Sequence, residues 1–545
     1  MHDRRQFLGT ALGAGAGLLA ARMSRAAEAR IDVLVGEPIG TIAPEIYGHF
    51  VEHLGGVVYD GIWVGEGSRI PNVGGVRKEI VDRLRQIRAS VIRWPGGCFA
   101  DQYDWRDGTG PHASRPRRTN FWVDVREWPE GAADGAQRYE PNQFGTVEFA
   151  RFCRLAGAQP YLAANVRSLS PQDFWRWVEY CNAPAGSTTS ADQRAADGER
   201  EPLGVRFWGV GNESWGCGGN FTPEEYAAAF RRYTAWLPWG GKLALIGAGP
   251  NSGELDWTRR FFAAVDGRGR QHLWGWALHH YSWNASGGRT TDWRAGKGDA
   301  LQFDPEQHYE LLSEADRMES LVNDHWRAMG ETDSGHRVKL VVDEWGAWHK
   351  PGTEPFREAL LGQQNTMRDA LVAGLSLDTF QRHADKVGMA NVAQLVNCLQ
   401  SLFLAHEDRF CLTPTYHVFD LYGAHQGAQS VRAVFGAPRV SYTRNGQPAS
   451  LYGLNGSASL KDRRLILTVT NPSLESPRET EVAVRGAAVR SIRAATLAAP
   501  DVHAHNTFES PAAVVPKEQP VSASGPSFVY RFLPASVTRL DIELG

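Results

Sequence analysis

The chain has 545 residues, a formal net charge of −3 and a mean hydropathy of −0.37, with 42% hydrophobic and 22% charged residues. This composition is typical of a soluble globular protein. The slightly negative charge argues against nucleic acid as a partner, because such domains carry a basic stripe. The length exceeds what one small core needs, so we expect a large domain and a smaller one.

The first 29 residues predict an export signal rather than a part of the fold. Arg4 and Arg5 precede a mildly apolar run of small residues over 10–21, and small residues at 24–29 offer cleavage sites. This order is typical of a bacterial twin-arginine signal, whereas the alternative is a chance arginine pair in a disordered tail. We therefore expect a periplasmic or extracellular protein. No later apolar run is long enough to span a bilayer, so no membrane partner is expected.

Six cysteines lie far apart along the chain, at positions 98, 153, 181, 217, 398 and 411. They form no C-x-x-C pair, so the sequence predicts neither a zinc ribbon nor a small disulfide-framed fold. The twin-arginine route carries proteins that have folded in the reducing cytosol. Most of these thiols are therefore expected to be free.

Short apolar runs alternate with helical patterns between residues 46 and 409. Several runs are continuously apolar, which is typical of strands covered on both faces. A helical pattern covers 77–88, and Thr222, Pro223 and Glu225 match the start of another helix. Eight such runs predict a (β/α)8 TIM barrel over 46–409, with a doubly wound sheet as the alternative. The runs are 46–53, 90–95, 160–166, 205–213, 243–247, 273–281, 338–344 and 389–396.

The pattern changes after about residue 410, where helical periodicity fades. Short strand-like runs appear between turn signals, at 465–469, 480–484, 527–532 and 536–544. They predict a β-sandwich over 410–545. A strand-like run at 31–35 has no partner nearby, so residues 30–45 are expected to supply an N-terminal strand that joins this sandwich.

Two glutamates end apolar strands of the predicted barrel. Glu213 ends the run 207–213 and Glu344 ends the run 338–344, where packing has no use for a carboxylate. Active sites of such barrels lie at the carboxyl ends of the strands. Two carboxylates in one pocket suit glycosidic bond cleavage, in which one donates a proton and the other attacks or stabilises the anomeric carbon. The alternative is that each glutamate forms an ion pair with Arg93 or a histidine.

Several long motifs resemble the α-L-arabinofuranosidases of glycoside hydrolase family 51, and they span nearly the whole chain after the predicted signal. They are RFWGVGNESWGCGGN (206–220), IYGHFVEHLG (46–55), IRWPGGCF (92–99) with DGTGP (107–111), VDEWG (342–346), QNTMRDALVAG (364–374), MANVAQ (389–394) and LTPTYHVF (412–419). The resemblance implies a barrel plus a sandwich completed by the N-terminal strand. It also implies a retaining, exo-acting hydrolase that releases terminal α-L-arabinofuranosyl residues from arabinan, arabinoxylan or derived oligosaccharides.

The resemblance further implies a role for each residue at the strand ends. Glu213 would be the general acid/base and Glu344 the nucleophile. The remaining residues would bind substrate or hold the nucleophile: Glu52, Asn212 and Gln394 through sugar hydroxyls, Tyr281 and Arg93 through Glu344, and Trp348 as a wall of the pocket. Cys98 departs from the family, in which many members carry Asn, and a thiol there would contact the sugar more weakly.

No cofactor and no metal are expected, and the resemblance implies a homo-oligomer, a trimer or a hexamer. Related barrels cleave β-xylosides or β-glucans, which remain alternative activities. A non-catalytic carbohydrate-binding protein is another alternative, since the chain has 19 tryptophans that could stack on sugar rings. His49, Glu52 and His53 match the H-x-x-E-H zinc pattern. That pattern needs a helix, and here it falls on a short strand-like run.

Overall fold

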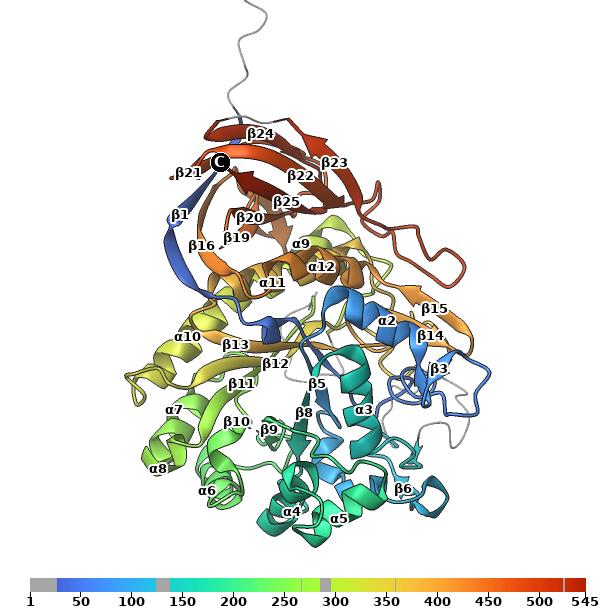
Figure 1. Ribbon diagram of the computed structural model, residues 1–545. Helices are drawn as coiled ribbons and strands as arrows, with labels where there is room; N and C mark the ends of the chain where they lie inside the picture. The colour runs from blue at the N-terminus through green and yellow to red at the C-terminus, as the bar shows by residue number, and fades with distance from the viewer. Residues whose placement is uncertain (1–26, 124–137, 266, 285–295, 358, 523–524) are drawn as a thin grey trace, which may run out of the picture.

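The computed structural model describes residues 27–123, 138–265, 267–284, 296–357, 359–522 and 525–545 (Figure 1). Most of the predicted export signal, residues 1–26, lies outside the described residues. Ala29, its last predicted residue, is already the first residue of strand β1 (Ala29–Thr41). Among the residues that the structure describes, no helix combines the length and the apolar character that a membrane crossing requires.

Eight parallel strands close into a barrel in the lower part of Figure 1. They pair in chain order, and the last strand, β13, pairs with the first, β2. Each of the eight predicted runs overlaps one of these strands, which confirms the TIM barrel, and the closed strand order excludes the open, doubly wound sheet. The strands are β2 (Gly48–Phe50), β5 (Val91–Trp94), β8 (Gln159–Ala164), β9 (Phe207–Val210), β10 (Ala244–Gly247), β11 (Leu273–Ser282), β12 (Lys339–Ala347) and β13 (Val387–Ala393).

The first barrel strand is shorter than its apolar run because Pro44–Tyr47 forms a 3-10 turn before it, with Pro44 at the first position. A cluster of buried apolar side chains from β5 and from β8 to β13 forms a core of its own, separate from the two larger clusters. Its members are Val91, Tyr161, Phe207, Ala244, Ile246, Ala277, Val341 and Met389. This packed layer leaves the carboxyl ends of the strands as the place for a site.

Several helices around the barrel begin at residues whose side chains cap them. Ser170, Thr222 and Asp304 each accept a hydrogen bond from the third residue of the helix that follows. The N-cap predicted at Thr222 is thus confirmed. The helices are α2 (Lys78–Ile87), α3 (Thr146–Ala156), α4 (Pro171–Asn182), α5 (Thr189–Ala196), α6 (Pro223–Thr234), α7 (Leu255–Ala264), α8 (Gly267–Arg270), α9 (Pro305–Asp316), α10 (Met318–Gly330), α11 (Met367–Arg382) and α12 (Pro414–Tyr422).

A nine-stranded sheet forms the upper part of Figure 1, in the order β23-β22-β25-β20-β19-β16-β1-β21-β24. Its two ends meet, because Tyr530 on β24 bonds Thr496 on β22 and Gln519 on β23. The sheet therefore folds over one apolar core, as a β-sandwich does. Its strands after β1 are β16 (Gln429–Gly436), β19 (Asn455–Lys461), β20 (Arg464–Asn471), β21 (Arg478–Arg485), β22 (Val489–Leu497), β23 (Lys517–Val521), β24 (Ser527–Phe532) and β25 (Ser536–Leu544).

The N-terminal strand completes this sandwich, as predicted. β1 pairs antiparallel with β16 and parallel with β21, and Ile31 and Val33 point into the sandwich core. Four two-stranded sheets lie elsewhere: β3 (Asn72–Val73) with β4 (Val76–Arg77), β6 (Arg118–Thr119) with β7 (Tyr139–Glu140), β14 (Phe403–His406) with β15 (Arg409–Leu412), and β17 (Val440–Arg444) with β18 (Gln447–Leu451). We keep the domain boundaries near residues 46 and 410 as proposals.

Helix α11 joins the two domains through a buried polar network. Asp378, in the middle of this helix, accepts hydrogen bonds from Tyr422, Ser457 and Thr468. Ser457 and Thr468 lie on the sandwich strands β19 and β20, whereas α11 precedes the barrel strand β13. Because each of these buried groups has a partner, the network fixes how the sandwich sits on the barrel.

Candidate active site

The carboxyl ends of the barrel strands bring the predicted site residues together. Parallel strands end on the same face of a barrel, so residues far apart in the sequence meet there. Arg93, Tyr281 and Glu344 lie in the carboxyl-terminal halves of β5, β11 and β12. The loops after β2, β9 and β13 carry the others, which are Glu52, Asn212, Glu213 and Gln394.

Glu344 is a buried carboxylate held by two donors. Arg93 Nη1 donates to its Oε1 at 2.8 Å, and the Tyr281 hydroxyl donates to its Oε2 at 2.7 Å. Burial alone would raise the pKa of Glu344. The charges of His279 and Arg93, together with the two donated hydrogen bonds, hold it below the ordinary value instead. Glu344 is therefore ionised at neutral pH, as an attacking carboxylate has to be.

Glu213 lies near Glu344, although β10 and β11 separate their strands, β9 and β12, in the barrel. Its side chain is 19% exposed, against 7% for Glu344, and its Oε1 lies 3.0 Å from His279 Nδ1. One oxygen of each glutamate and the His279 nitrogen lie within 4.8 Å of one another. Carboxyl groups about 5–5.5 Å apart are typical of retaining glycosidases, whereas inverting enzymes hold them about 6.5–9.5 Å apart.

Glu52 is a third carboxyl group of the site, and its pKa shifts in the opposite direction to that of Glu344. Its Oε1 accepts from the backbone N–H of Phe99 at 3.0 Å, and its Oε2 accepts from Gln394 Nε2 at 3.2 Å. Burial and the neighbouring charge of Glu344 raise the pKa of Glu52 to about 8, although the Phe99 N–H acts in the opposite direction. Glu52 is therefore mostly protonated at neutral pH and can donate a hydrogen bond.

A glycine pair lets the segment after β5 approach both carboxyl groups. A Cβ atom on Gly97 would lie 2.9 Å from Glu344 Oε1, and one on Gly96, whose φ is +159°, would lie 2.7 Å from Glu52 Cγ. Any larger residue would displace these carboxyl groups. The motif therefore places Gly96 and Gly97 where the backbone passes directly beside the site.

Arg93 connects the nucleophile candidate to its neighbours. Besides Glu344, its guanidinium donates to Asn212 Oδ1 at 2.6 Å, and its Nε lies 3.4 Å from Asp343 Oδ2. Asp343 also accepts from Tyr161 at 2.7 Å and from Asn391 at 2.8 Å. Asp343 thus balances the charge of a buried arginine that would otherwise face Glu344 alone.

The predicted residues also include Trp348, which lies beside the site. Its ring meets that of Tyr281 edge to face, with 5.1 Å between ring centroids. The histidines of the H-x-x-E-H pattern do not converge. His49 lies on β2 beside Phe419, whereas His53 contacts Glu140 and Trp94.

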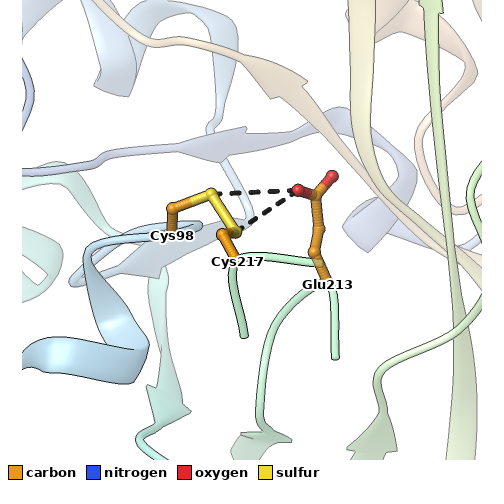
Figure 2. Close-up of side chains that lie close together, drawn as sticks. All are labelled: Cys98, Glu213 and Cys217. Atoms are coloured by element: carbon orange, nitrogen blue, oxygen red, sulfur yellow. Dashed lines mark hydrogen bonds between the residues drawn. A yellow bond between two sulfur atoms is a disulfide. The ribbon is translucent and has the colours of Figure 1, made fainter. Parts of the chain in front are cut away.

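The prediction of a thiol at position 98 is wrong, because Cys98 forms a disulfide with Cys217 (Figure 2). Cys98 follows β5 and Cys217 lies four residues after Glu213, so only the closed barrel brings them together. Their sulfurs lie 3.9 and 3.5 Å from Glu213 Oε2. A disulfide has no proton to donate, so these are contacts with the carboxylate. The other four cysteines are free and buried, as expected for most of the thiols.

Sequence reasoning left two site residues without a role. His279 lies between the two glutamates, and burial lowers its pKa while the charges of Glu344 and Glu213 raise it, with a net increase. Asp343 supports Arg93. Both lie at predicted strand ends, so their position was visible in the sequence, but their partners were not. Glu213, His279 and Glu344 also form a donor set that could hold a cation, and the expectation of no metal stays a prediction.

Known proteins are similar to this chain in sequence and in fold. A family model described as the α-L-arabinofuranosidase C-terminal domain matches residues 343–536, and one described as the α-L-arabinofuranosidase 1 domain matches 83–238. An intracellular exo-α-L-arabinofuranosidase of Bacteroides ovatus is 35% identical over 91% of this chain and 92% of its own length. The crystal structure of the GH51 arabinofuranosidase from Xanthomonas axonopodis pv. citri is 36% identical, with a TM-score of 0.85 over 95% of this chain and 100% of that one.

A second solved structure agrees in fold. The α-L-arabinofuranosidase from Thermotoga maritima, solved with arabinose, is 28% identical and has a TM-score of 0.79, covering 95% of this chain and 100% of that one.

The predicted export is contradicted by these relatives. The Bacteroides ovatus enzyme is named intracellular, and so is a relative from Acetivibrio thermocellus that is 31% identical over 68% of this chain and 71% of its own length. The predicted signal depends on an arginine pair and a run of small residues only. Such a short pattern also arises by chance, and no contact in the described residues supports it.

Proposed function

The chain belongs to the α-L-arabinofuranosidases of glycoside hydrolase family 51, and we propose that Glu344 is its nucleophile and Glu213 its general acid/base. The enzyme removes terminal α-L-arabinofuranosyl residues from arabinan, arabinoxylan or derived oligosaccharides, with retention of configuration. The observation that carries the assignment is the difference between the two carboxyl groups. Glu344 is buried and bonded to Arg93 and Tyr281, while Glu213 is more exposed and contacts no arginine among the described residues.

In the first step the Glu344 carboxylate attacks the anomeric carbon. The bond from that carbon to the leaving oxygen breaks, and the oxygen takes the proton of Glu213. The products are a covalent arabinosyl ester of Glu344 and the released alcohol. Tyr281 keeps Glu344 oriented through the 2.7 Å hydrogen bond, and Asn212, held by Arg93, would bond a sugar hydroxyl.

In the second step Glu213, now ionised, takes a proton from a water molecule. The water oxygen attacks the anomeric carbon and releases the Glu344 carboxylate, so two inversions give net retention. Glu52 and Gln394 bond each other and would bind further hydroxyls, and Trp348 would wall the pocket. No step needs a cofactor.

A panel of aryl glycosides tests the substrate and the stereochemistry together. We expect turnover of the aryl α-L-arabinofuranoside and at least about 10²-fold lower kcat/KM for the aryl β-xyloside, because the hydroxyl contacts fit one sugar shape. Proton NMR of the first product should show the α-anomer before mutarotation. A β-anomer, or faster turnover of the xyloside, would contradict this function. Light scattering on the same sample tests the proposed trimer or hexamer.

The fall of kcat/KM at alkaline pH, called the alkaline limb below, should depend on Glu52. Its pKa is raised to about 8, so it is neutral below that pH and becomes anionic as the pH rises through it. An anion there would lose its donated hydrogen bond and repel Glu344. We expect kcat/KM to fall about tenfold per pH unit above 8. A dinitrophenyl arabinofuranoside is the substrate to use, because its leaving group needs no proton from Glu213.

The Glu52→Gln variant is the control for this limb. Glutamine keeps the shape and a donor but cannot ionise, so the variant should be less active overall and lose the fall above pH 8. An unchanged alkaline limb in Glu52→Gln would assign that limb to another group.

A further inference from the structure

The segment after β5 is tied to the loop that carries Glu213 in two places. The first tie is the disulfide from Cys98 to Cys217, drawn beside Glu213 in Figure 2. The second is Asp101, three residues further along, whose Oδ2 accepts from the backbone N–H of Asn212 at 2.9 Å. One tie therefore lies on each side of Glu213 in the sequence.

Asp101 is a fully buried carboxylate whose oxygens accept from backbone amides. Besides Asn212, the N–H groups of Val166 and Arg167 donate to its Oδ1 at 2.7 and 3.2 Å. Val166 and Arg167 follow β8, and Asn212 follows β9. A single side chain from the loop after β5 thus fixes the ends of the next two strands. Burial raises the pKa of Asp101 to about 7, while the hydrogen bonds from these three backbone N–H groups act in the opposite direction and favour the ionised form.

The turn that carries Glu213 depends on such support. Glu213 has a φ of +39° and Gly211 a φ of +85°, so a residue with a side chain occupies the left-handed region. A non-glycine residue keeps that conformation only where its surroundings hold it. The turn is also closely packed, since a Cβ on Gly218 would lie 1.7 Å from the Asn212 carbonyl oxygen and 2.9 Å from Asp101 Oδ2.

We infer that Asp101 is a positioning residue that holds the Asn212–Glu213 turn, so that the Glu213 carboxyl group stays opposite Glu344 and in line with the leaving oxygen. It acts together with the Cys98–Cys217 disulfide and touches neither substrate nor the reacting atoms. This inference rests on the proposed role of Glu213 as general acid/base.

The test is the dependence of kcat/KM on the leaving group in Asp101→Asn. The asparagine keeps the size of the side chain but turns one acceptor into a donor, which repels an amide N–H. A displacement of about 1 Å costs on the order of 10²-fold in a positioned catalytic step. We expect that loss with a phenyl or alkyl leaving group, which needs the proton of Glu213, and less than about a threefold loss with a dinitrophenyl group.

A merely structural role would give a different pattern. It would lower kcat/KM by the same factor for every leaving group, or lower the fraction of active enzyme counted with a fluorinated covalent inactivator. Either result would overturn the inference. Asp333→Asn is the matched control. Asp333 is also buried and accepts from a backbone amide, that of Val338, but this contact lies at the amino end of β12, away from the site.

Two further variants test the inference if Asp101→Asn does not fold and separate it from the proposed function. If Asp101→Asn gives no folded protein, Asp101→Glu keeps the charge, lengthens the side chain by one carbon and should show the same leaving-group dependence. Glu213→Gln separates this inference from the proposed function. If Glu213→Gln shows no leaving-group dependence, the proposed function fails. If it does and the Asp101 variants do not, only the role of Asp101 fails.

Discussion

Replacing Glu344 with Gln should lower kcat for an aryl α-L-arabinofuranoside on the order of 10⁵-fold, as expected when a nucleophile is removed. An amide cannot form the glycosyl ester, and the amide oxygen still accepts the hydrogen bond from Arg93. Arg93 also keeps Asp343 as a partner, so no buried charge is left alone. The fold should therefore survive, which circular dichroism and a melting curve would check.

The matched control for this variant is Glu148→Gln. Glu148 is also buried, and its pKa is lowered to about 2 because the hydrogen bonds from His112 and Arg115 and the charge of Arg115 outweigh burial. It lies on α3 and contacts none of the site residues named above. Its loss should reduce stability while kcat stays within about threefold of the wild type. Activity lost equally in both variants would mean that Glu344 acts through stability alone.

Sodium azide gives the Glu344→Ala variant a distinctive product. The small anion can enter the space that the carboxylate leaves and attack the anomeric carbon directly. One inversion then gives the β-arabinofuranosyl azide, which NMR identifies. An α-azide from this variant would place the nucleophile elsewhere.

The barrel could be predicted because its strands are covered on both faces. Such strands stand out as short apolar runs such as 338–344, and each of the eight runs overlaps a strand. The ends of the strands were harder to predict. Ile46 and Tyr47, for example, begin the first apolar run but belong to the 3-10 turn Pro44–Tyr47. The N-terminal strand β1 was predicted to join the sandwich, but its pairing partners could not be predicted, because β16 and β21 lie more than 380 residues away.

The sequence predicted which residues form the site, but few of the contacts between them. The ends of the strands placed Glu213, Glu344 and Arg93 on one face, and the family resemblance gave each a role. The disulfide between Cys98 and Cys217 and the three hydrogen bonds that Asp101 accepts from backbone N–H groups arise only when neighbouring loops meet in space. Spacing along the chain holds no sign of such contacts. The export prediction was wrong for a similar reason, since it depended on a short local pattern.

Replacing Glu213 with Ala should separate the two steps of the reaction. With a phenyl leaving group, kcat/KM should fall by about 10²–10⁴-fold, the usual contribution of general acid catalysis. With a dinitrophenyl leaving group, the first step needs no proton, so kcat/KM should stay within about tenfold of the wild type. The second step still lacks its base, and the glycosyl ester on Glu344 should accumulate. Stopped-flow kinetics would then show a burst of dinitrophenol followed by slow turnover.

Azide should restore turnover of the Glu213→Ala variant and give a product of opposite configuration to that from Glu344→Ala. Azide needs no base, so it attacks the ester on Glu344 directly, and two inversions give the α-arabinofuranosyl azide. The space for it is available, because the Glu213 side chain is partly exposed beside the disulfide. A β-azide would mean that the two roles are exchanged. Equal losses for all leaving groups would mean that Glu213 is not the general acid. The pair of azide products therefore identifies both carboxyl groups independently of any change in stability.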